Sequence, residues 1–287
     1  MNNTNAAYIV GNGPSTTAER EFSAYDINMD HWRAKKPFGI SGCIRVRNEA
    51  QFMRASVESF LPYLDEIVLI TQPSEDNTVE LARQLAAEYD IVRVAEYPVI
   101  PAAPLTDEHI NTPVDSIHSF VYLSNWALAQ CRYSWICKVE GDVVALSTFA
   151  QVREQIEANP DAHRYYGMVI LNVAGVDGTM FSATNPRNAG WDEAVFNNDG
   201  SWYFIKNGKW ETIQHGEYAG DNVNVGWQLI HLKRCKDKHL GRWNGEVYMS
   251  LTRGNLAGAL GNYNRRSPYP GPDDPFGIDE LFDWRLR

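Results

Sequence analysis

The sequence predicts an α/β fold in which a mixed, mostly parallel sheet is flanked by helices. Three observations support this class. Short apolar runs alternate with longer helical patterns from about residue 38 to 144, as in repeated βα units. The run EIVLI at 66–70 is nearly continuously apolar, which is typical of a strand buried on both faces. The run WICKV at 135–139 leads into a Glu-Gly-Asp turn, and ligands gather at such strand ends in open α/β sheets.

The first half of the chain shows these elements in order. Strands are expected at 38–46, 66–70 and 91–97, with helices at 49–60 and from 76–78 to about 89 between them. Pro62 closes the first helix, and Asp76, Asn77 or Thr78 can cap the second. Residues 98–115 are rich in proline and polar residues and predict a long ordered loop. A helix at 116–130 and a strand at 134–139 follow.

The second half is less regular. It contains a predicted helix at 148–158, strands at 165–173 and 226–233, and a loop-rich stretch between them. Within that stretch, Asn207-Gly208 between two aromatic-rich runs predicts a hairpin with a type I′ turn. We divide the chain into an N-terminal extension (1–37), a core domain (38–261) and a C-terminal tail (262–287).

Composition limits the partners and the location. The 26 Lys and Arg against 36 Asp and Glu give a net charge of −10, which argues against a nucleic-acid partner. The longest apolar stretch, 168–176, is too short to span a membrane, and the N-terminus resembles no secretory signal, so we expect a cytoplasmic location. The cysteines lack C-x-x-C spacing and predict buried reduced thiols rather than a zinc site; they are Cys43, Cys131, Cys137 and Cys235.

Four stretches in a fixed order carry a family resemblance. They are GISGCIRVRNEAQFMRASVESFLPYLDEIVLI, TQPSEDNTVELARQLA, SNWALAQCRYSWICKVEGD and GWQLIHLK. Together they resemble the family 2 glycosyltransferases of the GT-A fold, most closely over residues 38–145. The resemblance implies a nucleotide-sugar half at about 38–145 and an acceptor half at about 146–261.

The resemblance also implies residues for the donor. The stretch Val46, Arg47, Asn48 and Glu49 would border the nucleoside. Glu140 and Asp142 would be the equivalent of the family's D-x-D motif, with Gly141 leaving room for the diphosphate. The acid that follows the second strand in the family is missing from the stretch 71–78 here, although Gln72 could still contact a base edge. The donor nucleotide therefore stays open.

We also expect a divalent cation to bind with the donor. A leaving nucleoside diphosphate develops negative charge, which Mn²⁺ or Mg²⁺ held by carboxylate oxygens can neutralise. Asp142 is the expected ligand together with Glu140, and a solvated turn is the alternative for an isolated E-G-D. Many GT-A enzymes complete the metal site with a histidine, here His231, whose alternative role is a core residue. Lys233 on the same strand face could meet the diphosphate or simply be a surface lysine.

Three acids are candidates for the catalytic base that takes the proton of the acceptor hydroxyl. Asp192 and Glu193 lie in a Gly-Trp-Asp-Glu stretch similar to G-F-D-E in the family, and Asp221 shortly precedes the predicted 226–233 strand. Each could instead be a solvated loop acid. Nearby aromatic residues could stack on sugar rings or pack in the interior; they are Trp191, Trp202, Tyr203, Trp210 and Trp227.

The sequence thus predicts an inverting, metal-dependent glycosyltransferase that moves a sugar from a nucleotide-sugar donor to a hydroxyl of a glycan or other acceptor. A nucleotidyltransferase is one alternative, although RVRNEA lacks the glycine-rich basic loop of that class. A non-catalytic carbohydrate-binding relative and a glycosyltransferase acting on a modified nucleic-acid base are the others. A separate turn, GNGPS at 11–15, resembles a nucleotide-contacting turn of certain bacterial sialyltransferases, or is an ordinary turn.

Overall fold

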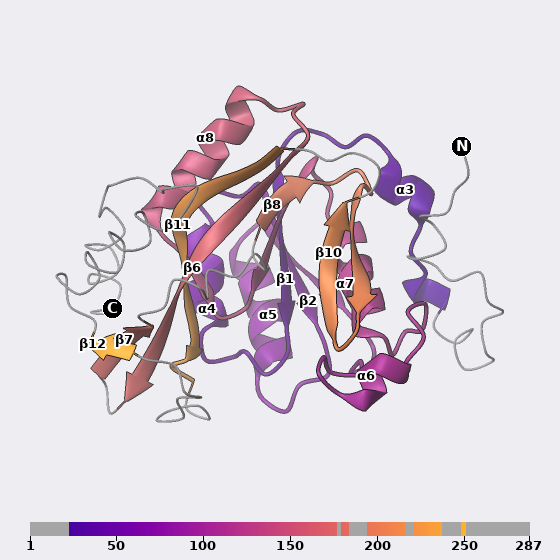
Figure 1. Ribbon diagram of the computed structural model, residues 1–287, viewed down its shortest axis with the longest axis horizontal. Coiled ribbons are helices and arrows are strands. Elements are labelled where there is room, and N and C mark those ends of the chain that lie inside the picture. The colour runs from indigo at the N-terminus through magenta and orange to yellow at the C-terminus, as the bar shows by residue number, and fades with distance from the viewer. Residues whose placement is uncertain (1–22, 177–178, 184–193, 216–220, 237–247, 251–287) are drawn as a thin grey trace. The chain divides into compact units, whose positions relative to one another are not determined.

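A computed structural model describes residues 23–176, 179–183, 194–215, 221–236 and 248–250. Figure 1 shows the helices and strands of these residues. The chain divides into two compact units. The first comprises Met1–Asn48, Asp65–Cys137 and Phe196–Gly220, and the second comprises Glu49–Leu64, Lys138–Val195 and Asp221–Arg287. The first three residues of strand β4 (Trp135–Glu140) belong to the first unit, and its last three belong to the second.

Parallel strands form the centre of the first unit. β1 (Ile40–Val46), β2 (Glu66–Thr71) and β3 (Val92–Glu96) pair in that order. Val46 pairs with Thr71, and Thr71 pairs with Glu96, so the three carboxyl ends lie at one edge of the sheet. Every residue of β2 is buried, as its nearly continuous apolar run predicts, and the burial includes Glu66 and Thr71 at its two ends. The helices α5 (Thr78–Glu88) and α7 (Phe120–Ala129) complete the βα pattern expected from the sequence.

Part of the expected N-terminal extension packs into the first unit. A 3₁₀ turn, η1 (Ser23–Tyr25), and a short helix, α3 (Met29–Arg33), lie in this part. Trp32 is 1% exposed, and the Tyr25 ring contacts the rings of Tyr97 and Trp126 at centroid distances of 5.9 and 5.6 Å. These aromatic contacts join residues 23–33 to the core of the first unit.

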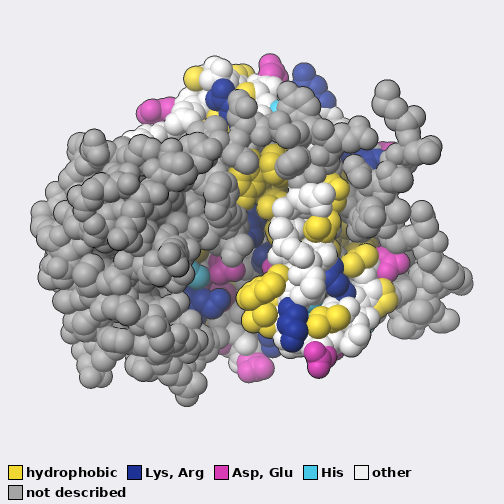
Figure 2. Space-filling model, in the orientation of Figure 1, with side chains coloured by type: hydrophobic (Ala, Val, Ile, Leu, Met, Phe, Trp, Pro, Cys, Tyr) yellow, Lys and Arg dark blue, Asp and Glu magenta, His cyan; other side chains and the backbone are white. Residues whose placement is uncertain are grey.

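The expected loop at 98–115 is ordered and contains a short helix, α6 (Asp107–Asn111). The Lys206 ammonium donates to the carbonyls of His109, at 2.7 Å, and of Thr112, which ties the loop to strand β9 (Trp202–Asn207). The Leu105 amide donates to the carbonyl of Lys209 at 2.8 Å. Leu105, Ile110 and Trp210 are 53%, 40% and 55% exposed, and Figure 2 shows hydrophobic side chains on this part of the surface.

The predicted hairpin is present, but its turn is different from the one expected. β9 pairs antiparallel with β10 (Trp210–His215), and Asn207 pairs with Trp210, so the turn consists of Gly208 and Lys209. Gly208 has φ 61°, whereas neither Asn207 nor Lys209 has a positive φ. One positive φ at the first turn position is typical of type II′, and type I′ would need two. The strand pairing thus places the glycine one position earlier in the turn than we expected.

The second unit contains a mixed sheet. β11 (Asp221–Arg234) runs parallel to β6 (Arg164–Val176) and antiparallel to β5 (Val143–Ala145). β7 (Thr179–Ala183) pairs antiparallel with β6 and with β12 (Tyr248–Ser250). The predicted strand at 226–233 is therefore the second half of a longer one. β7 and β8 (Ala194–Asn197) lie in the stretch that we expected to be loop, where alternation is weak.

Two helices flank the strands of the second unit. They are α4 (Met53–Phe60) and α8 (Ala150–Ala158), the latter preceded by a 3₁₀ turn, η2 (Ser147–Phe149). The Phe60 and Phe149 rings meet edge to face at a centroid distance of 5.4 Å, and the Ala145 amide donates to Ser59 Oγ at 2.9 Å. The predicted α/β class with a mixed sheet is confirmed. Among the described residues, no helix combines the length and apolarity needed to cross a membrane.

Asn125 is the residue whose loss should most weaken the packing of α7 on the hairpin. Its fully buried amide donates to the Phe204 carbonyl at 2.9 Å and accepts from the Phe204 amide at 2.7 Å. Asn125→Ala leaves both backbone groups without these bonds, so we expect it to lower the free energy of unfolding in urea by about 2–4 kcal/mol. Gln84→Ala, at an exposed position of α5, is the control and should change it by less than about 0.5 kcal/mol. Equal effects of the two substitutions would contradict this role.

Candidate metal centre

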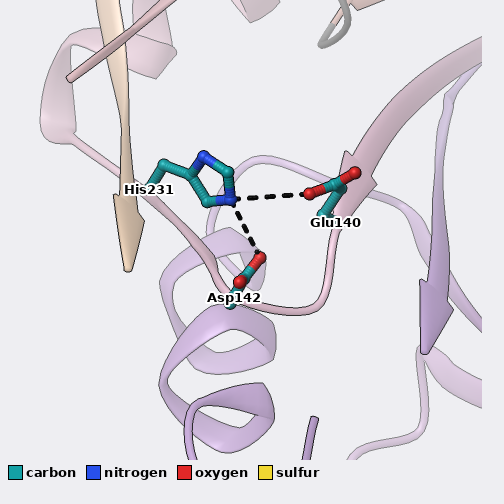
Figure 3. A group of neighbouring side chains, drawn as sticks. All are labelled: Glu140, Asp142 and His231. Atoms are coloured by element: carbon teal, nitrogen blue, oxygen red, sulfur yellow. Dashed lines mark ion pairs between the residues drawn. The ribbon is translucent and has the colours of Figure 1, made fainter. Parts of the chain in front are cut away.

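Three segments of the second unit bring Glu140, Asp142 and His231 together. Glu140 ends β4, and Asp142 lies in the turn between β4 and β5. β11 lies antiparallel to β5 with His231 opposite Val143, and the Leu232 amide donates to the Asp142 carbonyl at 2.9 Å. The strand pairing therefore sets the imidazole beside the acidic turn. Figure 3 shows the ring edge directed at both carboxylates.

The three side chains offer their polar atoms to one small volume. His231 Nε2 lies 3.3 Å from Asp142 Oδ1 and 3.5 Å from a Glu140 carboxylate oxygen. One potential ligand atom from each residue lies within 4.8 Å of the others. The Asp142 side chain is 2% exposed, that of His231 14% and that of Glu140 40%. Neither Asp142 Oδ1 nor His231 Nε2 makes a hydrogen bond within the described part of the chain.

Asn172 on β6 determines the orientation of the imidazole. It is the partner of His231 in the β6–β11 register, and its Oδ1 lies 2.9 Å from His231 Nδ1. An N–H at Nδ1 that donates to this oxygen leaves the lone pair of a neutral ring on Nε2. The lone pair then faces Glu140 and Asp142, as metal ligation requires.

Lys236 binds the other oxygen of Asp142. It follows β11 and is 5% exposed, and its ammonium lies 2.6 Å from Asp142 Oδ2. The same ammonium contacts both carboxylate oxygens of Glu49, at 2.6 and 2.7 Å. Glu49 begins the turn that leads into α4, where its carbonyl accepts from the Phe52 and Met53 amides. Lys236 thus joins three segments that are far apart in the sequence.

The charges in this cluster shift one another's pKa values. Burial opposes protonation of His231, but contacts with Asp142 and Glu140 outweigh it and raise the pKa of His231 to about 10. Against the effect of burial, His231 and nearby lysines lower the pKa values of Glu140 and Asp142. The pKa of Lys236 is raised by Asp142 and Glu49 although burial opposes this. Burial and then the charge of Asp142 raise the pKa of Glu49 to about 7.

The donor set fits a divalent cation. Two carboxylates supply the hard oxygens that Mg²⁺ and Mn²⁺ prefer, and a neutral imidazole nitrogen is a further ligand for Mn²⁺ and later transition metals. Asp142 Oδ1 and His231 Nε2 are buried 3.3 Å apart, and neither makes a hydrogen bond within the described part of the chain, so the pair needs a proton or a cation between the two atoms. These residues could therefore hold the expected ion.

The residues expected around the nucleoside do not all share one environment. Val46, Arg47, Asn48 and Gln72 belong to the first unit, and Glu49 belongs to the second. Val46 is fully buried, and Gln72 is 6% exposed. Asn48 has φ 57°, and its Oδ1 accepts from the Glu75 amide at 2.8 Å. Arg47 lies 3.9 Å from the Glu75 carboxylate and keeps 36% of its side chain exposed.

Some of the remaining predicted site residues lie among the described residues, and others lie outside them. Lys233 is exposed near the end of β11, and its charge acts on Glu140. Gly141 is buried in the acidic turn, and Asp221 is the first residue of β11. Asp192, Glu193, Trp191 and the GNGPS turn lie outside the described residues. Trp202 and Tyr203 are buried in the first unit and unsuited to stacking on a sugar, whereas Trp210 is exposed.

Sequence reasoning missed Asn172 and Lys236. The only signal for Asn172 was a polar residue within the apolar run MVILNVAGV, and we took that run only as a strand. Lys236 lies in RCKDK, where nothing in the pattern distinguishes one lysine from another. Glu49 was expected at the nucleoside, and the structure pairs its carboxylate with Lys236.

Comparisons with known proteins give distant similarities. No protein-family model matches the chain, and no curated protein matches it. S. aureus TarS is 12% identical over 86% of this chain and 42% of its own, with a TM-score of 0.41. TarS 1-349 in complex with UDP-GlcNAc is 14% identical over 86% of this chain and 71% of its own, with a TM-score of 0.41.

Another similar structure is glucosyl-3-phosphoglycerate synthase from Mycobacterium tuberculosis in complex with Mn²⁺, uridine-diphosphate and phosphoglyceric acid. It is 14% identical over 56% of this chain and 50% of its own, with a TM-score of 0.33. The chain therefore spans half or less of the length of this synthase and of TarS.

The raised pKa of His231 predicts how stability depends on pH without metal. The folded-state pKa of about 10 lies above the ordinary 6.5, so protonated His231 stabilises the fold fully below about pH 6.5. This contribution is lost as the pH rises toward 10. We expect wild type to lose a few kcal/mol more of its free energy of unfolding over this window than His231→Gln, since one pKa unit is worth about 1.4 kcal/mol.

Urea unfolding in EDTA measures this difference. His163→Gln, which replaces an exposed histidine, is the control and should follow wild type. Parallel pH profiles of wild type and His231→Gln would rule out the stabilisation of the imidazolium.

Proposed function

We propose that this chain is a metal-dependent glycosyltransferase that moves a sugar from a nucleotide-sugar donor to a hydroxyl of a glycan or other acceptor, with inversion. One observation carries the proposal. In an α/β fold, Glu140, Asp142 and His231 converge at the end of a strand, and the buried Asp142 Oδ1 and His231 Nε2 make no hydrogen bond among the described residues. The resemblance of the sequence to family 2 glycosyltransferases names the same three residues for the metal.

In the proposed reaction Glu140, Asp142 and His231 hold Mn²⁺ or Mg²⁺. When bound, the ion supplies positive charge for the leaving nucleoside diphosphate. In a neutral ring, an Nδ1–H that donates to Asn172 Oδ1 places the His231 lone pair on Nε2, and Lys236 contacts Asp142 Oδ2. The exposed ammonium of Lys233 is available to the diphosphate. These residues bind and orient the donor.

Other residues of the proposal rest on the sequence resemblance. Arg47, Asn48 and Gln72 are the candidates for contact with the nucleoside, with the Asn48 amide oxygen already bound to the backbone of Glu75. Asp192, Glu193 or Asp221 is the base that removes the proton from the attacking hydroxyl. Removal of that proton makes the oxygen a better nucleophile at the anomeric carbon.

Nucleotide binding should depend on the metal. We expect one nucleoside diphosphate from a panel to raise the melting temperature in the presence of Mn²⁺ and to have little effect in EDTA. A ligand at about 100 times its dissociation constant stabilises by about 2.7 kcal/mol, which is well within detection. If no nucleotide stabilises the protein with either metal, and no nucleotide-sugar is hydrolysed or transferred, the proposal is wrong. Binding without turnover would instead favour the non-catalytic carbohydrate-binding relative.

Asp142→Asn should abolish this metal-dependent binding. The amide keeps the shape of the carboxylate but removes the charge that holds the cation, so we expect nucleotide affinity with Mn²⁺ to fall by roughly a hundredfold or more. Calorimetry measures the loss, and circular dichroism checks that the variant is folded. Asp90→Asn, at an exposed position, is the matched control and should bind as wild type. Retained binding by Asp142→Asn would remove Asp142 from the metal centre.

A further inference from the structure

Lys236 is an internal cation of the candidate metal centre. Its ammonium is enclosed between the carboxylates of Glu49 and Asp142 at 2.6 Å from each, and the residue is 5% exposed. A buried ammonium is costly unless it is paired, and here two acids from different segments pair it. Such a contact is too enclosed to be an ordinary surface ion pair, which would contribute little.

The contact divides the two oxygens of Asp142 between different cations. Oδ2 binds Lys236, whereas Oδ1 faces His231 Nε2 at 3.3 Å and makes no hydrogen bond within the described residues. The ammonium thus leaves Oδ1 as the oxygen that Asp142 can offer to a metal. Loss of Lys236 would free Oδ2 as a second oxygen that Asp142 could offer to a cation.

The Lys236 ammonium contributes one positive charge to the centre. Glu49, Glu140 and Asp142 are three carboxylates in mutual electrostatic contact, and Lys236 is the cation that two of them touch. Lys138 and Lys233 add positive charge on the Glu140 side. Removing Lys236 makes the centre one unit more negative, which favours a bare cation and disfavours an anion.

We propose that Lys236 sets the charge of the metal centre: its ammonium occupies Asp142 Oδ2, which weakens the hold of the centre on a bare cation, and keeps the centre positive enough for a diphosphate to bind. The part of this inference that concerns the diphosphate rests on the proposed function. The part that concerns the metal does not. A residue that only supports the fold would affect cation and anion binding in the same direction.

Lys236→Met tests the inference with two probes at about pH 8. Electron paramagnetic resonance of free Mn²⁺ measures the affinity for the bare ion, and calorimetry measures the affinity for the preformed 1:1 manganese–pyrophosphate complex, which is anionic. We expect bare Mn²⁺ to bind roughly tenfold more tightly to Lys236→Met, and the pyrophosphate complex to bind roughly tenfold more weakly. Lys209→Met removes an exposed lysine of the first unit and should leave both affinities unchanged.

Glu49→Gln provides the mirror experiment and does not require Lys236→Met to fold. It makes the centre one unit more positive, so bare Mn²⁺ should bind more weakly and the pyrophosphate complex more tightly. The double variant Glu49→Gln with Lys236→Met restores the charge and should bring both affinities back toward wild type.

The outcomes separate the inference from the proposed function. Changes in the same direction for both probes, or no change, overturn the role of Lys236. If wild type binds Mn²⁺ but not the pyrophosphate complex, the proposed function fails, and the bare-ion measurements still decide whether Lys236 controls the metal. If wild type binds no Mn²⁺, both are overturned.

Discussion

The site depends on one constraint, which is the burial of the Asp142 carboxylate. A buried carboxylate without partners costs several kcal/mol, so positive or polar groups must reach it from other parts of the chain. Here His231 comes from one strand and Lys236 from the turn that follows it, while the Leu232 amide binds the Asp142 carbonyl. The antiparallel pairing of β11 with β5 is what makes all three contacts possible.

The register of the strands on either side of β11 determines the position of His231. His231 is opposite Val143 on β5 and Asn172 on β6, so two neighbouring strands determine its position. A slip of one residue would turn the imidazole to the other face of the sheet and leave Asn172 without this contact. Asn172 is thus a polar residue in an apolar strand whose place is explained by the ring it orients rather than by core packing.

Much of this arrangement could be predicted from the sequence. Apolar periodicity gave β1, β2, α5 and the strand that ends at Glu140, because burial of a strand or helix leaves a local pattern. The family resemblance supplied Asp142 and His231. Glu49 and Lys236 could not be paired in this way, because they are 187 residues apart and their contact follows from strand pairing. Asn207-Gly208 predicted a hairpin, but the strand register, a non-local property, decided which residues form the turn.

The net charge of −10 and the anionic donor that we propose are compatible only if charge is distributed unevenly. The second unit concentrates cations around its acidic turn: Lys236 at Asp142, His231 between the two acids, and the charges of Lys138 and Lys233 at Glu140. Carboxylates contact both His231 and Lys236, so positive and negative charges lie close together in the cluster, and a divalent ion would shift its local charge by two units. An acidic protein could then hold the proposed diphosphate at one point, because the field there is set by contacts of 2.6–3.5 Å, whereas charges farther apart than about 10 Å are screened by salt.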